Sequence, residues 1–181
     1  LFGIEMRPDI TIGDASRLAL FADASADAVF SSHTLEHIVD WHQALREWWR
    51  LVKPGGHLVL YLPHAEFYPR IGEHGSNPDH KHDFLPDDIN AAMREISSDW
   101  TLLENQTRAE RDEYSFLLVL RKEAVGAGQR DDPEHDRDQD DQRAEVWLAW
   151  VRASCSVYLK VTPTRAMASN QLFSCAVMPK L

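Results

Sequence analysis

The sequence predicts an α/β fold built on a mostly parallel sheet. Short apolar runs bounded by turn residues recur up to Leu62, which is the form that buried parallel strands take. Between Ala26 and Leu62 a strand, a helix, a glycine turn and a second strand follow one another. That order is typical of a right-handed crossover between parallel strands. Two β-rich stretches after it predict an antiparallel hairpin.

Three short runs predict the first strands. Leu1–Glu5 is apolar and ends in an acid, Ile10–Asp14 repeats that form, and Ala26–Ser32 is the third. Because Leu1 is not a methionine and already lies in a strand-like run, we expect the chain to begin inside a domain.

A helix is predicted after the third strand. Asp40 is a good N-cap, and Gln43 stands three residues on, as in a capping box. Pro54-Gly55-Gly56 is expected to end the helix and turn the chain. The apolar residues recur at intervals of three and four and form one face: Trp41, Ala44, Leu45, Trp48, Leu51 and Val52.

The next elements follow in order. His57–Leu62 is a strand closed by Pro63, and the polar stretch from His64 to Phe84 is a loop. Pro86 suits the first turn of a helix that runs to about Ser97. Trp100–Arg108 and Tyr114–Lys122 are β-rich and are joined by a short polar link, so we expect them to pair in antiparallel fashion.

The composition shifts after this hairpin and predicts three parts, at residues 1–123, 124–143 and 144–181. Gly126–Arg143 is acidic and almost free of apolar residues, so we expect a disordered linker. The apolar residues of the last part recur at no regular interval. This part could be a truncated second domain, a packing tail or sequence out of its natural frame.

The charge and cysteine content exclude some classes. A formal net charge of −10 argues against a protein that holds nucleic acid mainly by neutralising phosphates, although a local basic patch could still serve. Cys155 and Cys175 are far apart, which fits a reducing, cytoplasmic setting and no disulfide framework. No apolar run reaches the roughly 18 residues that span a bilayer, so no membrane partner is expected.

Four segments form one pattern along the first third of the chain. They are Ile12-Gly13-Asp14-Ala15 with Leu18, Phe21–Phe30, Ser32–Ile38 with Asp40, and Leu51–Leu60. In register, these segments resemble the Rossmann-like S-adenosylmethionine-dependent methyltransferases, in particular their small-molecule "type 11"-like branch. The resemblance covers roughly Leu1 to Lys122 and implies a doubly wound sheet, S-adenosylmethionine as cofactor and a small-molecule or sugar-like acceptor.

The chain departs from the family pattern in two places. The family's first strand and its glycine-rich loop are absent from the sequence, and few residues separate Glu5 from Asp14. We therefore expect an N-terminally truncated domain that binds the cofactor weakly or not at all. The alternative function is a non-catalytic remnant or interaction module. A nucleotide-binding dehydrogenase is disfavoured, because the Leu35-Glu36-His37 and Lys53–Gly56 segments resemble methyltransferases.

The resemblance implies cofactor contacts for five residues. Glu5 would accept hydrogen bonds from the ribose hydroxyls, because a carboxylate has two oxygens to offer a diol. Asp14 would accept the adenine amino group, with the Ala15 N–H at the ring, and Ser32 and His33 would face the methionine end. The alternatives are a solvated turn acid at Glu5, a cap at Asp14 and a surface cap at His33.

The histidines are the candidates for catalysis. His64 follows the strand end and is our candidate general base, ahead of His80 and His82 in the loop. Each could instead be structural. Glu36 and His37 are interpreted as orienting the loop rather than as an acid–base pair. No metal ligands are assigned. The rival hypothesis is a divalent metal held by His80-Lys81-His82-Asp83 with His74 and His64.

Overall fold

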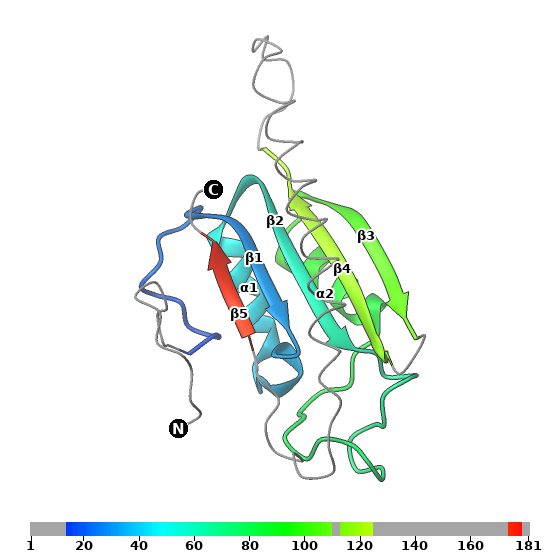
Figure 1. Ribbon diagram of the computed structural model, residues 1–181. Coiled ribbons are helices and arrows are strands. Elements are labelled where there is room, and N and C mark those ends of the chain that lie inside the picture. Colours follow the sequence, from blue (N-terminus) through cyan, green and yellow to red (C-terminus); the bar gives the residue numbers. More distant parts are fainter. Residues whose placement is uncertain (1–13, 110–112, 125–173, 179–181) are drawn as a thin grey trace.

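The computed structural model describes residues 14–109, 113–124 and 174–178. In this part of the chain a five-stranded sheet is joined by two α-helices and one 3-10 helix, η1 (Figure 1). None of the described helices is both long and apolar enough to cross a membrane. The elements in chain order are β1 (Ala26–Ser32), η1 (Leu35–His37), α1 (Trp41–Leu51), β2 (Val52–Pro63), α2 (Pro86–Ile96), β3 (Trp100–Arg108), β4 (Ser115–Lys122) and β5 (Ser174–Met178).

The sheet is mixed, with strand order β3-β4-β2-β1-β5. Only β1 and β2 pair in parallel, while β2 with β4, β3 with β4 and β1 with β5 are antiparallel. The predicted crossover and the predicted antiparallel hairpin are both confirmed. The described pairings do not meet the expectation of a mostly parallel sheet, because β4 lies antiparallel between β2 and β3, and β5 pairs antiparallel with β1.

Helix α1 begins where the sequence predicts and ends earlier than its glycines. The Asp40 side chain accepts the Gln43 N–H at 3.0 Å and caps the first turn. The last helical residue is Leu51, and the strand starts at Val52, so Pro54-Gly55-Gly56 lies inside β2. The β1–β2 register shifts there, and Gly55 takes a φ of 81° that favours glycine. The glycines thus shape a bulge and do not end the helix.

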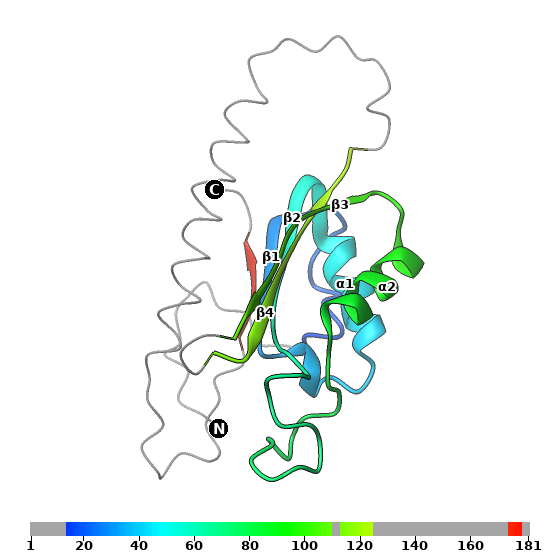
Figure 2. The same cartoon turned by 90° about the vertical axis from the view of Figure 1, so that its right-hand side faces the viewer.

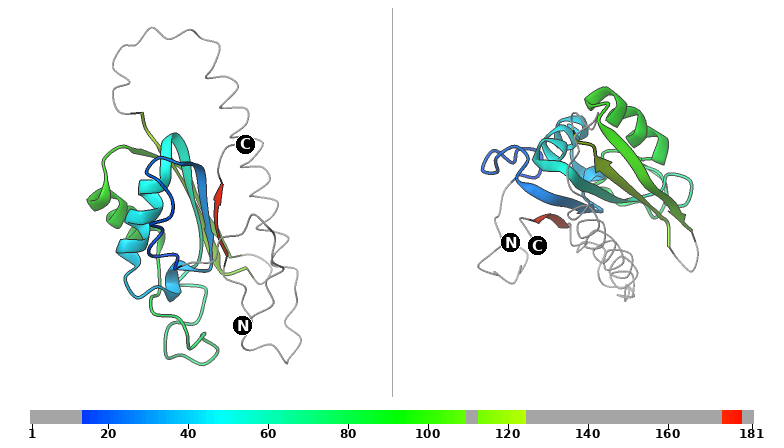
Figure 3. Two further views of the ribbon diagram at one scale, coloured as in Figure 1. Left: turned by 90° about the vertical axis from the view of Figure 1, so that its left-hand side faces the viewer. Right: turned by 90° about the horizontal axis from the view of Figure 1, so that it is seen from above.

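Both described helices cover the same face of the sheet (Figures 2 and 3). Their buried residues pack on alternate side chains of β2 and β4, including Leu58, Leu60 and Leu118. Among the described residues, Trp48 of α1 is the largest fully buried side chain. The side chains of β2 and β4 that point to the opposite face of the sheet form a second buried apolar cluster, around Val59 and Leu117. The described helices therefore do not form the doubly wound arrangement, which needs helices on both faces.

Several predictions fall partly or wholly outside the described residues. The strand predicted at Leu1–Glu5, most of Ile10–Asp14 and the acidic stretch Gly126–Arg143 lie there. In the C-terminal part, Ser174–Met178 forms β5 and pairs with β1 from Ser32↔Ser174 to Ala28↔Met178. This edge strand has no counterpart among the elements that the sequence predicts, and the proposed domain boundaries stay predictions.

Candidate functional site

The candidate site lies where the parallel strands β1 and β2 end side by side. Ser32 pairs with Tyr61 at the end of the shared register, and the loops that leave both strands begin at His33 and His64. Ligands of open α/β sheets bind outside the carboxyl ends of the strands. The structure therefore brings three of the predicted residues, Ser32, His33 and His64, to one edge.

Glu36 of η1 lies at the centre of this edge and is buried, with 1% of its side chain exposed. Three imidazole nitrogens surround its Oε1 atom: His33 Nδ1 at 3.6 Å, His37 Nε2 at 3.8 Å and His80 Nε2 at 3.9 Å. Its main-chain carbonyl accepts the N–H groups of Lys81 and His82 at 2.7 and 3.2 Å. Glu36 thus joins η1 to the loop that follows β2.

Burial changes the protonation of the groups around Glu36. The pKa values of His37 and His80 lie below their ordinary value, because burial penalises the imidazolium ion more than the Glu36 carboxylate favours it. Both rings are therefore held toward the neutral form. Burial, with the charge of Glu36 as a smaller cause, also raises the pKa of Tyr114.

Aromatic rings line the same cluster. The Tyr68 ring lies 5.2 Å from that of His80 and 4.8 Å from that of Tyr114, between centroids. The His37 and His80 rings meet edge to face at 4.7 Å. Neutral imidazoles and phenols of this kind can contact a ring-shaped ligand through their faces and their polar edges.

His33 adopts a left-handed backbone conformation with a φ of 47°. A non-glycine residue pays about 1–2 kcal/mol for this conformation, and such residues concentrate at functional sites. Its main-chain N–H donates to the Tyr61 carbonyl at 2.9 Å, and its Nε2 lies 3.3 Å from Ser115 Oγ. The N-cap of η1 is Thr34 rather than His33, so the reading of His33 as a surface cap is not supported.

His64 lies at the predicted strand end, but its ring is packed inside the protein. Its Nδ1 accepts the Glu66 N–H at 3.2 Å, and the ring meets Phe116 edge to face at 5.7 Å between centroids. Its own main-chain N–H donates to the Tyr114 carbonyl at 2.8 Å. These contacts give His64 a structural part, and its catalytic role stays a prediction.

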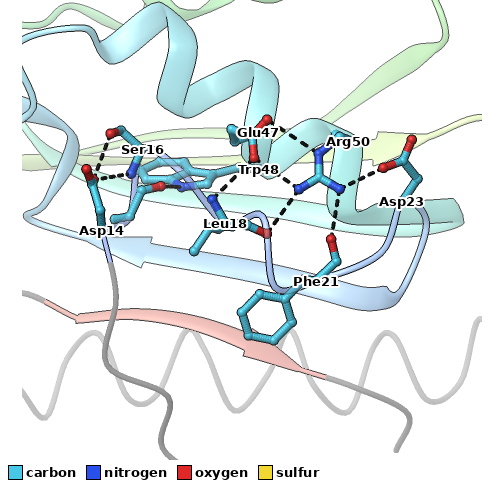
Figure 4. A network of polar contacts seen from close by, with 9 residues as sticks. Asp14, Ser16, Leu18, Phe21, Asp23, Glu47, Trp48 and Arg50 are labelled. Carbon is cyan, nitrogen blue, oxygen red and sulfur yellow. Dashed lines mark hydrogen bonds and ion pairs between the residues drawn. The ribbon is translucent and has the colours of Figure 1, made fainter.

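Asp14 and Ala15 belong to a turn that is fixed to α1. Asp14 Oδ1 accepts the N–H and the hydroxyl of Ser16 at 2.9 and 2.7 Å, and these bonds lower the pKa of the exposed carboxyl. The Ala15 carbonyl accepts Trp48 Nε1–H at 2.8 Å (Figure 4). Asp14 therefore caps a turn, and its carboxylate still has acceptor capacity for a ligand. Glu5 lies outside the described residues.

Arg50 holds the rest of this segment against the same helix (Figure 4). Its guanidinium donates to the carbonyls of Leu18 and Phe21 at 3.1 and 2.9 Å and pairs with Asp23 at 2.7 Å and Glu47 at 3.0 Å. The turn at Asp14 thus depends on side chains of α1 for its position.

The loop ligand set that the sequence suggested does not assemble. His82 Nε2–H donates to the carbonyls of Ile38 and Val39, both at 3.1 Å, and Asp83 accepts the Ile71 N–H. His74 is exposed. From that set, only His80 lies close to other candidate ligands. These are Glu36 and His37, which the sequence analysis interprets as orienting the loop. Only the fold brings His80 close to Glu36 and His37, so no spacing pattern in the sequence indicates this group.

Comparison with known proteins points to one family. The family profile described as "Methyltransferase domain" matches residues 4–60. The demethylmenaquinone methyltransferase of Mycobacterium marinum is 52% identical over 48 residues, which are 26% of this chain and 20% of that protein. The enzyme of the same name from Deinococcus radiodurans is 34% identical over 94 residues, 42% of this chain and 38% of that protein. The chain thus spans about a fifth to two fifths of these relatives.

Solved structures show a similar fold at low identity. A S-adenosylmethionine-dependent methyltransferase from Mesorhizobium loti superimposes with a TM-score of 0.50 at 16% identity, covering 64% of this chain and 72% of that one. The cyclase SpnF superimposes with a TM-score of 0.51 at 18% identity, covering 63% and 56%. At these identities the likeness is one of fold alone.

Proposed function

We propose that the protein transfers a methyl group from S-adenosylmethionine to a small molecule, because residues 4–60 match the family profile described as "Methyltransferase domain". The family match carries this proposal. It includes Asp14, Ser32 and α1 and ends inside β2. It therefore covers the carboxyl end of β1, one of the two strand ends at which an open α/β sheet binds its ligand.

We propose that the cofactor is held by Glu5, Asp14, Ala15, Ser32 and His33. Two observations support this proposal. The exposed Asp14 carboxylate can accept an amino group beside its bonds to Ser16. At the end of β1, the Ser31 hydroxyl is buried and has no hydrogen-bond partner among the described residues, so a polar ligand would relieve the cost of burying it.

When bound, S-adenosylmethionine supplies a methyl group on a positively charged sulfur, and positioning then accounts for much of the rate. The rigid ends of β1 and β2 are the platform for that positioning. For a hydroxyl acceptor, we propose that His64 removes the proton, directly or after local movement of its ring. If the acceptor is already nucleophilic at neutral pH, no base is needed.

The acceptor class rests on two supports. The relatives are named for methylation of demethylmenaquinone, which is a small molecule. The edge also carries the rings of Tyr68, His80 and Tyr114, which suit stacking on a planar or sugar-like ring. The formal charge of −10 disfavours a nucleic-acid acceptor.

The proposal is tested with the full-length product of the gene that encodes this chain. The protein is incubated with S-adenosylmethionine labelled in its methyl group and with panels of quinols, phenols and hydroxylated sugars. We expect label in the low-molecular-mass fraction, and inhibition by S-adenosylhomocysteine. Label in RNA or protein alone would contradict the acceptor class. Absence of both transfer and cofactor binding would favour a non-catalytic interaction module.

A further inference from the structure

We propose that Glu36, His37 and His80 bind a divalent transition-metal ion such as zinc. The ring of His80 also lies in the aromatic surface proposed for the acceptor, but metal binding does not depend on methyl transfer, and the two proposals can fail separately. One carboxylate and two imidazoles are ligands that zinc takes readily, and three protein ligands leave a fourth position for water or another side chain.

The spacing of the ligand atoms fits a single ion. Glu36 Oε1 lies 3.8 Å from His37 Nε2 and 3.9 Å from His80 Nε2, and the three ligand atoms all lie within 4.8 Å of one another. Zinc bonds of about 2.0–2.2 Å in a tetrahedral site place ligand atoms roughly 3.3–3.6 Å apart. A closure of a few tenths of an ångström for each carboxylate–imidazole pair, and of up to about 1.5 Å between the two imidazole nitrogens, completes the site.

The same distances are too long for direct hydrogen bonds. An N–H donor and a carboxylate oxygen meet at about 2.7–3.2 Å, yet the nitrogens of His33, His37 and His80 stand at 3.6, 3.8 and 3.9 Å from one oxygen. A shared proton would draw one nitrogen in. When one ion lies between an oxygen and several nitrogens, each nitrogen stands at a similar distance from that oxygen, as is seen here.

Burial favours a cation at this position. Both carboxylate oxygens of Glu36 are buried, and among the described residues neither accepts a hydrogen bond. In the same part of the chain His80 Nε2 is also buried without a hydrogen-bond partner. An ionised carboxylate without compensation costs several kcal/mol in such a place. A metal ion would satisfy the carboxylate and the His80 nitrogen together.

The orientation of His37 matches that of a metal ligand. Its Nδ1 lies 3.2 Å from the Asp79 carbonyl, and a carbonyl can only accept, so the ring proton is on Nδ1. The Nε2 atom of the neutral ring then directs a lone pair toward Glu36. Metal-bound histidines usually donate their other N–H to a carbonyl in this way.

An ion at this point would fasten the loop after β2 to η1. Glu36 and His37 belong to η1, His80 belongs to the loop, and main-chain bonds from Lys81 and His82 to Glu36 already join the two. His33 Nδ1 lies 3.6 Å from the same oxygen and is our candidate for the fourth position. The ion would thereby fix one wall of the edge formed by β1 and β2.

The test is cobalt titration of the chelator-treated 181-residue chain, followed by visible absorption and by competition with zinc. We expect one equivalent of cobalt to give a tetrahedral spectrum that zinc abolishes. Glu36→Gln and His80→Ala should each weaken binding at least about tenfold, the scale on which even supporting residues of metal sites act. The control is His74→Ala, an exposed histidine of the same loop, which should bind as the wild type does.

Loss of the tetrahedral spectrum in His74→Ala but not in His80→Ala would overturn the assignment, as would a wild-type chain without a stoichiometric site. Circular dichroism checks the fold of each variant.

A second experiment needs only the wild-type chain. The X-ray absorption spectrum of the zinc-loaded chain should show nitrogen and oxygen neighbours with at least two imidazoles, and one imidazole or none would contradict the proposal.

Discussion

Arg50→Met should destabilise the protein through the segment that carries Asp14. The guanidinium holds the carbonyls of Leu18 and Phe21 at 3.1 and 2.9 Å. A hydrogen bond from a charged donor contributes about 1.5 kcal/mol or more, so two such bonds amount to roughly 3 kcal/mol. The Arg50 side chain is 26% exposed, so hydrogen bonds to water offset part of this free energy. The ion pair with Asp23, which is 79% exposed, adds at most about 1 kcal/mol.

We therefore expect a loss of about 2–3 kcal/mol in the free energy of unfolding for Arg50→Met. Arg50→Lys should lose about half as much, because lysine keeps the charge but not the planar fork. Urea unfolding measures both. The control is Arg46→Met, an exposed position on the same helix, which should stay within about 0.5 kcal/mol of the wild type. If Arg50→Met matched Arg46→Met, the guanidinium would not be what holds the segment to α1.

Three further predictions follow from the described contacts. Gly56→Ala should cost about 1–3 kcal/mol, because a Cβ there would lie 2.7 Å from the Asp27 carbonyl oxygen; an unchanged urea midpoint would contradict this. Trp48→Phe should cost about 2–3 kcal/mol by calorimetric unfolding, since it leaves the Ala15 carbonyl without its donor and opens space in the core. His64→Ala in a folded full-length protein should slow methyl transfer by about 10²–10⁴-fold if it is the base; a rate near that of the wild type would remove it from the mechanism.

Local signals in the sequence were sufficient for much of the fold. The N-cap at Asp40, the strand Ala26–Ser32 and the antiparallel pair β3 and β4 follow from residues close together in the chain, and the structure confirms them. The end of α1 was misjudged because Pro54-Gly55-Gly56 reads as a helix stop. In the structure it serves instead as a bulge in β2.

The parts that escaped prediction depend on contacts between distant residues. The sequence of Ser174–Met178 contains no pattern that indicates pairing with β1, so this pairing could not be predicted. In the same way, nothing in the spacing of His80 indicates that it meets Glu36. The resemblance identified the edge of the sheet that holds the candidate site, but not the buried carboxylate at its centre.

Equilibrium binding of S-adenosylmethionine to the full-length gene product, measured by calorimetry, tests the central claim most directly. We expect saturable binding that S-adenosylhomocysteine displaces and NAD does not. Asp14→Ala should weaken it about fivefold, the equivalent of one hydrogen bond of about 1 kcal/mol. Absence of binding to the full-length protein, or preferential binding of NAD, would contradict the assignment of this chain to methyl transfer.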